Sequence, residues 1–431
     1  MSLRFATLAL LAWASVHLSP VAAQSDPVLD SRAAYQEALK AYHAHDVPAF
    51  VRYAREADRL RPDHGGVIYA LASAQALAGD TGAALRALRR FAALGYSADV
   101  AADSDFVSLT GSVAFDGVRR ALARNGETLA PGRPAFTLPE RDLLVEGIAH
   151  DPATKAFFVG SVRHRKILRV GPDGRTSTFV AAGGGGLWAP LGMRVDSARR
   201  VLWVASAALP QMARSAGADS LRSGLFRFDL ATGELTGRYL IPDDGKPHAL
   251  GDVTITRSGD VYTTDSRGPV IYRVRAGSDS LEPFVESPLL LSAQGLALDR
   301  AERSLYVADY ARGLLRVDLA SREVRLLPVG RDVLVLGIDG LYMVGDDLVA
   351  IQNGVTPHRV VRLRLGPRGD RVARAEVLER ARPDWAEPTL GVVVGHDLFY
   401  VGNSQWEHFR EDGTIDAPDR LQTPMVLRLA L

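Results

Sequence analysis

Short apolar runs alternate with polar connectors through the last two thirds of the chain. The clearest stretch is residues 294–328, QGLALDRAERSLYVADYARGLLRVDLASREVRLLP. Its apolar positions fall in four short alternating runs, Leu296–Leu298, Leu305–Val307, Leu314–Val317 and Val324–Leu326. Alternation over a few residues, bounded by polar turn residues, is typical of strands. This stretch therefore predicts a four-stranded antiparallel meander.

The same pattern recurs at a spacing that suits the blades of a β-propeller. By subtraction, successive copies begin 45, 61, 42, 45 and 51 residues apart, at Glu146, Leu191, Asp252, Gln294, Asp339 and Leu390. A propeller blade takes roughly 40 to 50 residues. We therefore predict a mainly β fold, with a six-bladed β-propeller over residues 134–431. Because the sixth copy has only three strands of its own, we expect residues 134–138 (PAFTL) to supply the fourth and close the ring.

The residues before the propeller have a helical pattern instead. Two segments superimpose with an offset of 34 residues, Tyr35 on Tyr69 and Asp46 on Asp80, which is the period of tetratricopeptide repeats. We predict a small α-helical, tetratricopeptide-like repeat domain over residues 25–127 and a linker over 128–133. Two interpretations stay open: the helices bind a protein or peptide partner, or they brace the propeller.

The first 23 residues predict a signal peptide. Arg4 precedes an apolar run from Phe5 to Ala14, and the small residues Val21, Ala22 and Ala23 precede Gln24. A short membrane anchor is the alternative, but Ser15, His17 and Pro20 interrupt the run. We expect an exported protein, periplasmic or secreted, with no membrane span after cleavage.

Composition excludes several classes of function. The formal net charge of +1 gives no support for nucleic-acid binding. The absence of cysteine excludes disulfides, thiolate metal sites and a cysteine nucleophile. No Gly-x-Ser-x-Gly motif is present, so serine-hydrolase chemistry has no support.

The first strand of each propeller blade lines the central channel, so residues in one register converge near its mouth. That register places three carboxylates and one amide on a ring with two leucines: Glu146, Leu191, Asp252, Gln294, Asp339 and Leu390. Converging carboxylates repel one another, which protonation or a bound cation relieves. Oxygen ligands favour calcium, with magnesium, manganese or zinc as alternatives. A solvated channel mouth without an ion is the other interpretation.

The propeller region resembles the gluconolactonase, senescence-marker-protein and strictosidine-synthase-like superfamily of six-bladed propellers. The resemblance rests on EGIAHDP at Glu146, on QGLALD with LYVADY at Gln294, and on IDGL at Asp339. It implies that Glu146, Gln294 and Asp339 ligate a divalent cation and that Asp339 acts as base or nucleophile. Asp252 lies where an Asn-Asp pair often ligates or contacts substrate. The chain departs from the family pattern in having Gln294 for Asn and Gly251 before Asp252.

These residues suggest a hydrolase of a lactone or ester, in which Asp339 or Asp252 activates a water and His150 shuttles protons. A channel or inter-blade role for His150 is the alternative. A lyase acting on a cyclic ester shares the same site. The rival hypothesis is a non-catalytic periplasmic interaction protein that binds partners through both regions. Asn353 and Asn403 follow second strands and either face the mouth or form turns; the insertion between Ala208 and Ser223 is a candidate lid or partner loop.

Overall fold

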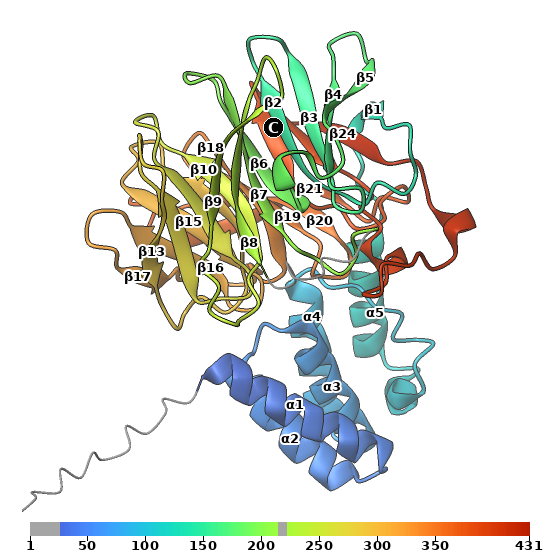
Figure 1. The fold of residues 1–431 in the computed structure, drawn as a ribbon. Coiled ribbons are helices and arrows are strands. Elements are labelled where there is room, and N and C mark those ends of the chain that lie inside the picture. Colours follow the sequence, from blue (N-terminus) through green and yellow to red (C-terminus); the bar gives the residue numbers. More distant parts are fainter. Residues whose placement is uncertain (1–25, 214–221) are drawn as a thin grey trace, which may run out of the picture.

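The computed structural model describes residues 26–213 and 222–431, and six four-stranded antiparallel sheets make up most of it (Figure 1). Blade 1 consists of β2 (Val145–Asp151), β3 (Ala156–Ser161), β4 (Lys166–Val170) and β5 (Thr176–Val180). Blade 2 consists of β6 (Ala189–Asp196), β7 (Val201–Ala207), β8 (Ser223–Asp229) and β9 (Leu235–Leu240). Blade 3 consists of β10 (Leu250–Ile255), β11 (Val261–Asp265), β12 (Val270–Val274) and β13 (Leu281–Glu286). Blades 4 and 5 consist of β14 (Ala293–Leu298), β15 (Ser304–Asp309), β16 (Gly313–Asp318) and β17 (Val324–Leu326); and β18 (Ile338–Val344), β19 (Asp347–Gln352), β20 (Arg359–Leu365) and β21 (Val372–Arg380). The predicted six-bladed propeller is confirmed.

The sixth blade closes the ring with strands from both ends of the propeller. Its strand order is β1 (Arg133–Thr137), β24 (Met425–Ala430), β23 (Asp397–Val401) and β22 (Gly391–Val394). The register pairs Arg133 with Arg428 and Thr137 with Met425. The strand expected at 134–138 thus supplies the fourth strand of blade 6, one residue earlier than predicted. With this strand from the start of the propeller, blade 6 has four strands like the other blades, and the ring is closed.

In blades 1 to 5, a β-bulge at the start of the first strand turns one residue toward the channel. The pairing of first and second strands shifts between Val145 and Ile148 in blade 1, and the same shift occurs at the corresponding position of blades 2 to 5. Bulges redirect side chains and often lie beside functional sites. The glycine that follows the turned residue is required by packing: a Cβ at Gly147 would lie 1.9 Å from the Leu191 carbonyl oxygen of the next blade.

The hydrophobic core of the propeller is divided among the interfaces between neighbouring blades. Phe158 and Ile167 of blade 1 pack with Met193 and Phe226 of blade 2, and equivalent buried clusters fill the other interfaces. Since each blade buries its apolar residues against two neighbours, the ring must be complete before any blade is fully packed.

The helical region consists of α1 (Pro27–His43), α2 (Val47–Leu60), α3 (Gly65–Leu77), α4 (Thr81–Ala93), the 3₁₀ helix η1 (Ser104–Leu109) and α5 (Val113–Gly126). The offset of 34 residues is visible in the caps: the Asp46 side chain accepts from the Ala49 amide at the start of α2, and Asp80 accepts from Ala83 at the start of α4. None of the helices described is both long and apolar enough to cross a membrane. The predicted signal peptide lies outside the described residues, as does most of the 208–223 insertion.

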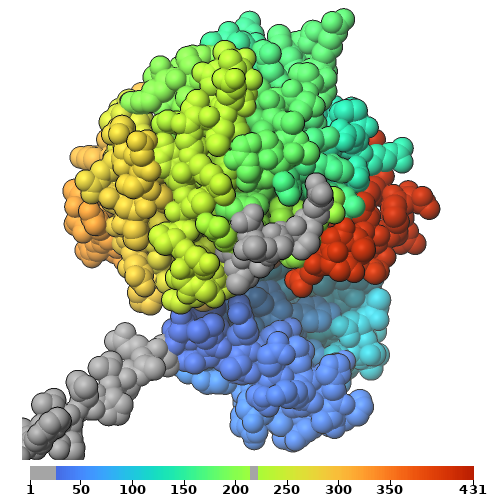
Figure 2. Space-filling view, in the orientation of Figure 1, coloured from blue at the N-terminus to red at the C-terminus, as the bar shows by residue number. Residues whose placement is uncertain are grey.

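The helices pack against one side of the propeller (Figures 1 and 2). Leu334, Leu336 and Val355 from loops of blades 4 and 5 share one buried cluster with α3, α4 and α5. The Ser97 amide donates to the Thr356 carbonyl at 3.0 Å, and the Arg61 guanidinium donates to the Ala311 carbonyl at 2.5 Å. Ala311 follows β15, and Thr356 follows β19; the ends of these two strands pair with Ala293 and Ile338 at the mouth. The helices therefore border the mouth of the channel.

Candidate functional site

The residues of the predicted ring line one cavity of about 220 Å³ at the mouth of the channel. All members of that ring take part: Glu146, Leu191, Asp252, Gln294, Asp339 and Leu390. Arg267, Ser266 and Trp406 complete part of its wall. The repeated register thus places the predicted carboxylates and the amide together, because the bulge that redirects them recurs from blade to blade.

Glu146 is held by a residue from the far end of the chain. Its Oε2 accepts a hydrogen bond of 2.7 Å from the indole Nε1 of Trp406, and only 9% of the residue is exposed. Burial and the nearby Asp339 carboxylate raise the pKa of Glu146 well above its ordinary range, although the Trp406 bond lowers it. The buried Gln405 amide secures the loop that carries Trp406 by accepting from the Gln422 amide at 2.6 Å and donating to its carbonyl at 3.2 Å.

Asp339 is linked by hydrogen bonds to a tyrosine at the propeller surface. Its Oδ2 accepts from the Asn353 Nδ2 at 2.8 Å, and the Asn353 Oδ1 accepts from the Tyr310 hydroxyl at 3.0 Å. Burial raises the pKa of Asp339 to about 7; the Asn353 bond opposes this, while Glu387 and Asp252 raise it further. The chain fixes the carboxylate orientation and connects it to the loop beside the helices.

Asp252 carries a buried oxygen that no described group satisfies. The residue is 5% exposed, its Oδ1 accepts from the Val253 amide at 2.8 Å, and its Oδ2 has no hydrogen-bond partner among the described residues. Burial raises the pKa of this carboxyl, against the lowering effects of Arg194 and of the Val253 and Leu296 backbone amides, although the Leu296 amide does not reach Oδ2 with hydrogen-bond geometry. A buried carboxylate oxygen without a donor calls for a proton, a water or a cation.

Gly251 and Gln294, the two positions at which the chain differs from the family that its sequence resembles, lie side by side. A Cβ at Gly251 would lie 3.8 Å from the Gln294 Oε1, so the space that a side chain at position 251 would need borders the longer amide of Gln294. The Gln294 Nε2 donates to the Ser292 Oγ at 3.3 Å. With the nitrogen on Ser292, the amide oxygen is available within the cavity.

Trp406 lines the cavity and Glu387 acts on its carboxylates from outside it, but the repeat pattern identified neither residue. Glu387 raises the pKa of both Glu146 and Asp339 by repulsion. Burial, together with Glu407, raises its own pKa to about 6. Both residues lie in loops of blade 6 outside the strand register, so alternation carried no signal for them.

His150 and Asn403 lie outside this cavity. His150 is four residues beyond Glu146, roughly 13 Å along an extended strand, and its ring packs on Phe157 at 4.7 Å between centroids. Neither residue is among those described that line the cavity. Asn403 bonds instead to the Thr423 carbonyl and the Met425 amide of its own blade. The structure gives Asn403 a turn-stabilising position and gives His150 an inter-strand one.

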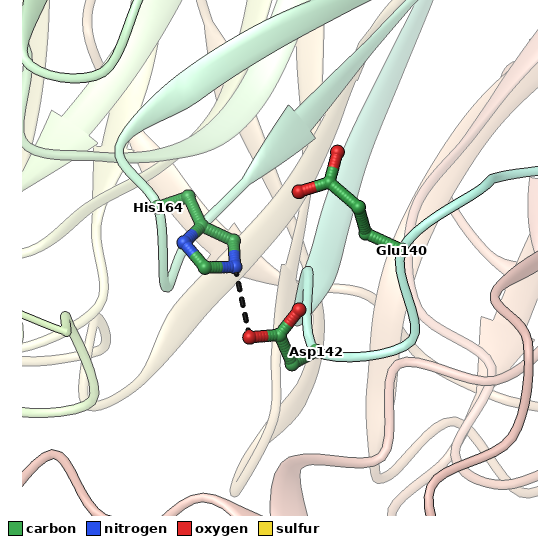
Figure 3. A group of neighbouring side chains, drawn as sticks. All are labelled: Glu140, Asp142 and His164. Carbon is green, nitrogen blue, oxygen red and sulfur yellow. Dashed lines mark ion pairs between the residues drawn. The ribbon is translucent and has the colours of Figure 1, made fainter.

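A second acidic group lies at the rim of blade 1, in Glu140, Asp142 and His164 (Figure 3). Among the described residues this is the one group of at least three His, Asp or Glu side chains whose ligand atoms all lie within 4.8 Å of one another. However, the Lys166 ammonium binds both Glu140 oxygens, at 2.6 and 2.8 Å, and Arg163 lies 3.6 Å from Asp142. These cations already neutralise the two carboxylates, so the group is an ion-pair cluster at the surface.

The channel residues have the donor set that a hard divalent cation prefers. Glu146, Asp252, Asp339 and the Gln294 amide offer oxygen atoms only, and one of those oxygens is buried without a donor. Because the three carboxylates are not a group with all ligand atoms within 4.8 Å, direct binding through all three requires their side chains to move closer together. A cation would also offset their mutual repulsion.

No protein-family model matches the sequence, and no curated protein sequence matches it. Solved structures do match. One is a gluconolactonase from Xanthomonas campestris, with 16% identity, coverage of 72% of this chain and 93% of that chain, and a TM-score of 0.47. Another is the calcium-binding protein regucalcin from Agrobacterium tumefaciens, with 18% identity, 69% and 93% coverage and a TM-score of 0.46.

A third structure is virginiamycin B lyase from Staphylococcus aureus, with 16% identity, 68% and 83% coverage and a TM-score of 0.45. The chain is similar to these three proteins. Their names cover a lactonase, a calcium-binding protein and a lyase. Since one fold hosts different chemistries, function must be argued from the site.

Proposed function

We propose that this chain is a divalent-cation-dependent hydrolase of a lactone or ester. Glu146, Asp252, Gln294 and Asp339 would hold the cation, with calcium preferred because every ligand atom is an oxygen. The observation that carries the proposal is the buried, unpartnered Asp252 Oδ2 within a cavity lined by two further buried carboxylates. When bound, the cation polarises the substrate carbonyl and stabilises negative charge on its oxygen.

The residues of the chain would supply the proton transfers. Asp339 is the preferred base because the Asn353 hydrogen bond holds its buried carboxylate in a fixed orientation at the cavity. It removes a proton from water as the water oxygen bonds to the acyl carbon. The bond from that carbon to the ester oxygen then breaks, and the departing oxygen takes up the proton that the base removed from water, which restores the base. Asp252 is the alternative base, and the proposal gives His150 no role.

The shape of the site supports a small substrate. The cavity of about 220 Å³ accommodates the reacting ring or acyl group, and Leu191 and Leu390 give it apolar walls beside the carboxylates. Trp406 and Asn353 fix two of the carboxylates by hydrogen bonds, so part of the constellation is oriented before a substrate arrives.

Hydrolysis of a panel of lactones and aryl esters, with calcium and with chelator, tests the proposal. We expect calcium-dependent turnover that Asp339→Asn and Asp252→Asn both reduce, with the larger fall in kcat for the variant of the base. Mass analysis separates hydrolysis, which adds one water to a lactone, from elimination by a lyase, which leaves the mass unchanged. Calcium binding without turnover on any substrate would favour the interaction protein, in which both regions serve as binding surfaces.

A further inference from the structure

A second cavity lies outside the channel, between the helices and the loops of blades 4 and 5. It measures about 720 Å³. The helices and their connections form most of its wall, and Tyr310, Ala311, Gly337 and Val355 close it on the propeller side. Cavities of about 300 to 1,000 Å³ at the boundary between structural regions are typical of sites for small molecules.

Aromatic side chains dominate this inter-region cavity. Seven of its 24 lining residues are Phe or Tyr, whereas these and Trp make up 7% of the chain. Phe91 and Tyr96 stack at 4.7 Å, and Tyr69 meets Phe91 edge-on at 5.6 Å. The Tyr69 hydroxyl is already bonded to Asp103, and the Tyr96 hydroxyl to the Asp63 carbonyl. Their rings thus offer apolar surface that suits a flat aromatic ligand.

Two arginines give the cavity a positive end. Arg32 and Arg61 line it, and neither forms a salt bridge with a carboxylate in the described part of the chain. Burial lowers the pKa of Arg61; Asp63 opposes this, and the neighbouring Arg32 and Arg312 lower it further. Burial and the same arginines, Arg61 and Arg32, lower the pKa of His64 to about 4, so His64 is neutral. An anion at this end would offset the repulsion between the guanidinium groups.

The acidic residues of the cavity lie farther from the propeller and are engaged. Asp105 accepts from the Tyr42 hydroxyl at 3.3 Å and from Ser73, and Asp103 accepts from Tyr69. Ser73 is eight residues beyond Gly65, about 12 Å along α3 at 1.5 Å per residue. Arg61, by contrast, lies next to the start of α3 and contacts Ala311 of the propeller. The cavity is therefore polarised, with its cations on the propeller side.

We propose that this inter-region cavity binds a small planar aromatic carboxylate, with the ring against Tyr69, Phe91 and Tyr96 and the carboxylate at Arg61 and Arg32. The binding does not depend on the chemistry of the channel. The two sites are nevertheless adjacent, because Tyr310 lines this cavity and its hydroxyl reaches Asp339 through Asn353. A bound ligand would lie beside the tyrosine that begins that chain.

Calorimetric titration of the purified chain with 2-naphthoate and with its uncharged counterpart 2-naphthamide tests this proposal. We expect one saturable site for naphthoate and at least tenfold weaker binding of naphthamide, about the value of one charge-assisted hydrogen bond. Arg61→Gln should weaken naphthoate binding by about tenfold and leave naphthamide unchanged. Arg59→Gln is the matched control, because Arg59 is exposed and pairs with Glu56 at 2.7 Å, and it should bind naphthoate as the unaltered chain does.

The comparison of the two ligands on the unaltered chain needs no variant, so it decides the matter even if Arg61→Gln does not fold. Absence of saturable naphthoate binding would overturn the proposal. Equal affinity for naphthoate and naphthamide would overturn the role of the arginines, and equal losses in Arg61→Gln and Arg59→Gln would do the same. Loss of channel activity has no bearing on these outcomes, which rest on binding alone.

Discussion

Replacing Asp339 by asparagine should stabilise the cation-free protein while it disables the channel site. Asp339 is 9% exposed, and burial raises its pKa from 3.8 to about 7. A group whose pKa is raised on folding stabilises the protein when protonated, and that contribution is lost as the pH rises from about 4 through 7. At about 1.4 kcal/mol per pKa unit, the ionised carboxylate costs about 4 kcal/mol above pH 7. An amide keeps the shape and still accepts the Asn353 bond without that charge.

Thermal unfolding in chelator across pH 4 to 8 measures this effect. Unfolding entropy of about 2.1 cal/mol/K per residue gives about 0.9 kcal/mol/K for 431 residues. The variant should therefore unfold about 4 to 5 °C higher at pH 8, and its advantage should vanish near pH 4. Asp318→Asn is the control, and it should lower the unfolding temperature at pH 8. Backbone amides in an exposed turn lower the pKa of Asp318, so its ionised form is the one that stabilises the protein. An Asp339→Asn chain that is less stable than the original at pH 8 would refute the reasoning.

Three further changes test other parts of the structure. Trp406→Phe removes the indole bond that lowers the Glu146 pKa, so the pH at which half of the calcium affinity is lost should move upward; an unchanged titration profile would contradict this. Glu379→Gln breaks a fully buried network in which the carboxylate accepts from Arg382 at 2.8 Å and Tyr400 at 2.5 Å. It should cost about 3 kcal/mol in urea unfolding without changing calcium affinity, and a loss of less than half that would count against the network. Deleting residues 25–127 exposes Leu334, Leu336 and Val355, so light scattering should detect aggregation; a soluble fragment with an unaltered unfolding midpoint would show that the helices are dispensable.

The propeller was predictable from sequence because each blade is a local meander with its own apolar alternation. The ring of channel residues was predictable for a related reason. The bulge that turns Glu146 inward recurs at the same register in four further blades, so residues in equivalent positions converge. Because the last blade had only three strands of its own, the sequence predicted that the strand around Pro134 completes it, and Pro134 pairs with Leu427.

The remaining site residues depend on contacts that no periodic pattern encodes. Trp406 reaches Glu146 across 260 positions of sequence, through a loop fixed by Gln405. Glu387 repels the Glu146 and Asp339 carboxylates from another irregular loop, which precedes β22. The packing of the helices on the mouth side depends on Leu334 and Leu336, which precede the strand pattern of blade 5. The helical period predicted the paired helices but carried no information on where they pack.

The central claim is that the channel mouth binds a divalent cation through Glu146 and its neighbours. Calorimetric titration of the chelator-stripped chain with calcium, repeated with magnesium, manganese and zinc and on Glu146→Gln, tests it most directly. We predict one saturable calcium site, tighter at pH 8 than at pH 6 because the raised carboxyl pKa values make protons compete with the ion, and lost in Glu146→Gln. No saturable binding of any of these ions, or binding that Glu146→Gln leaves intact, would contradict the account.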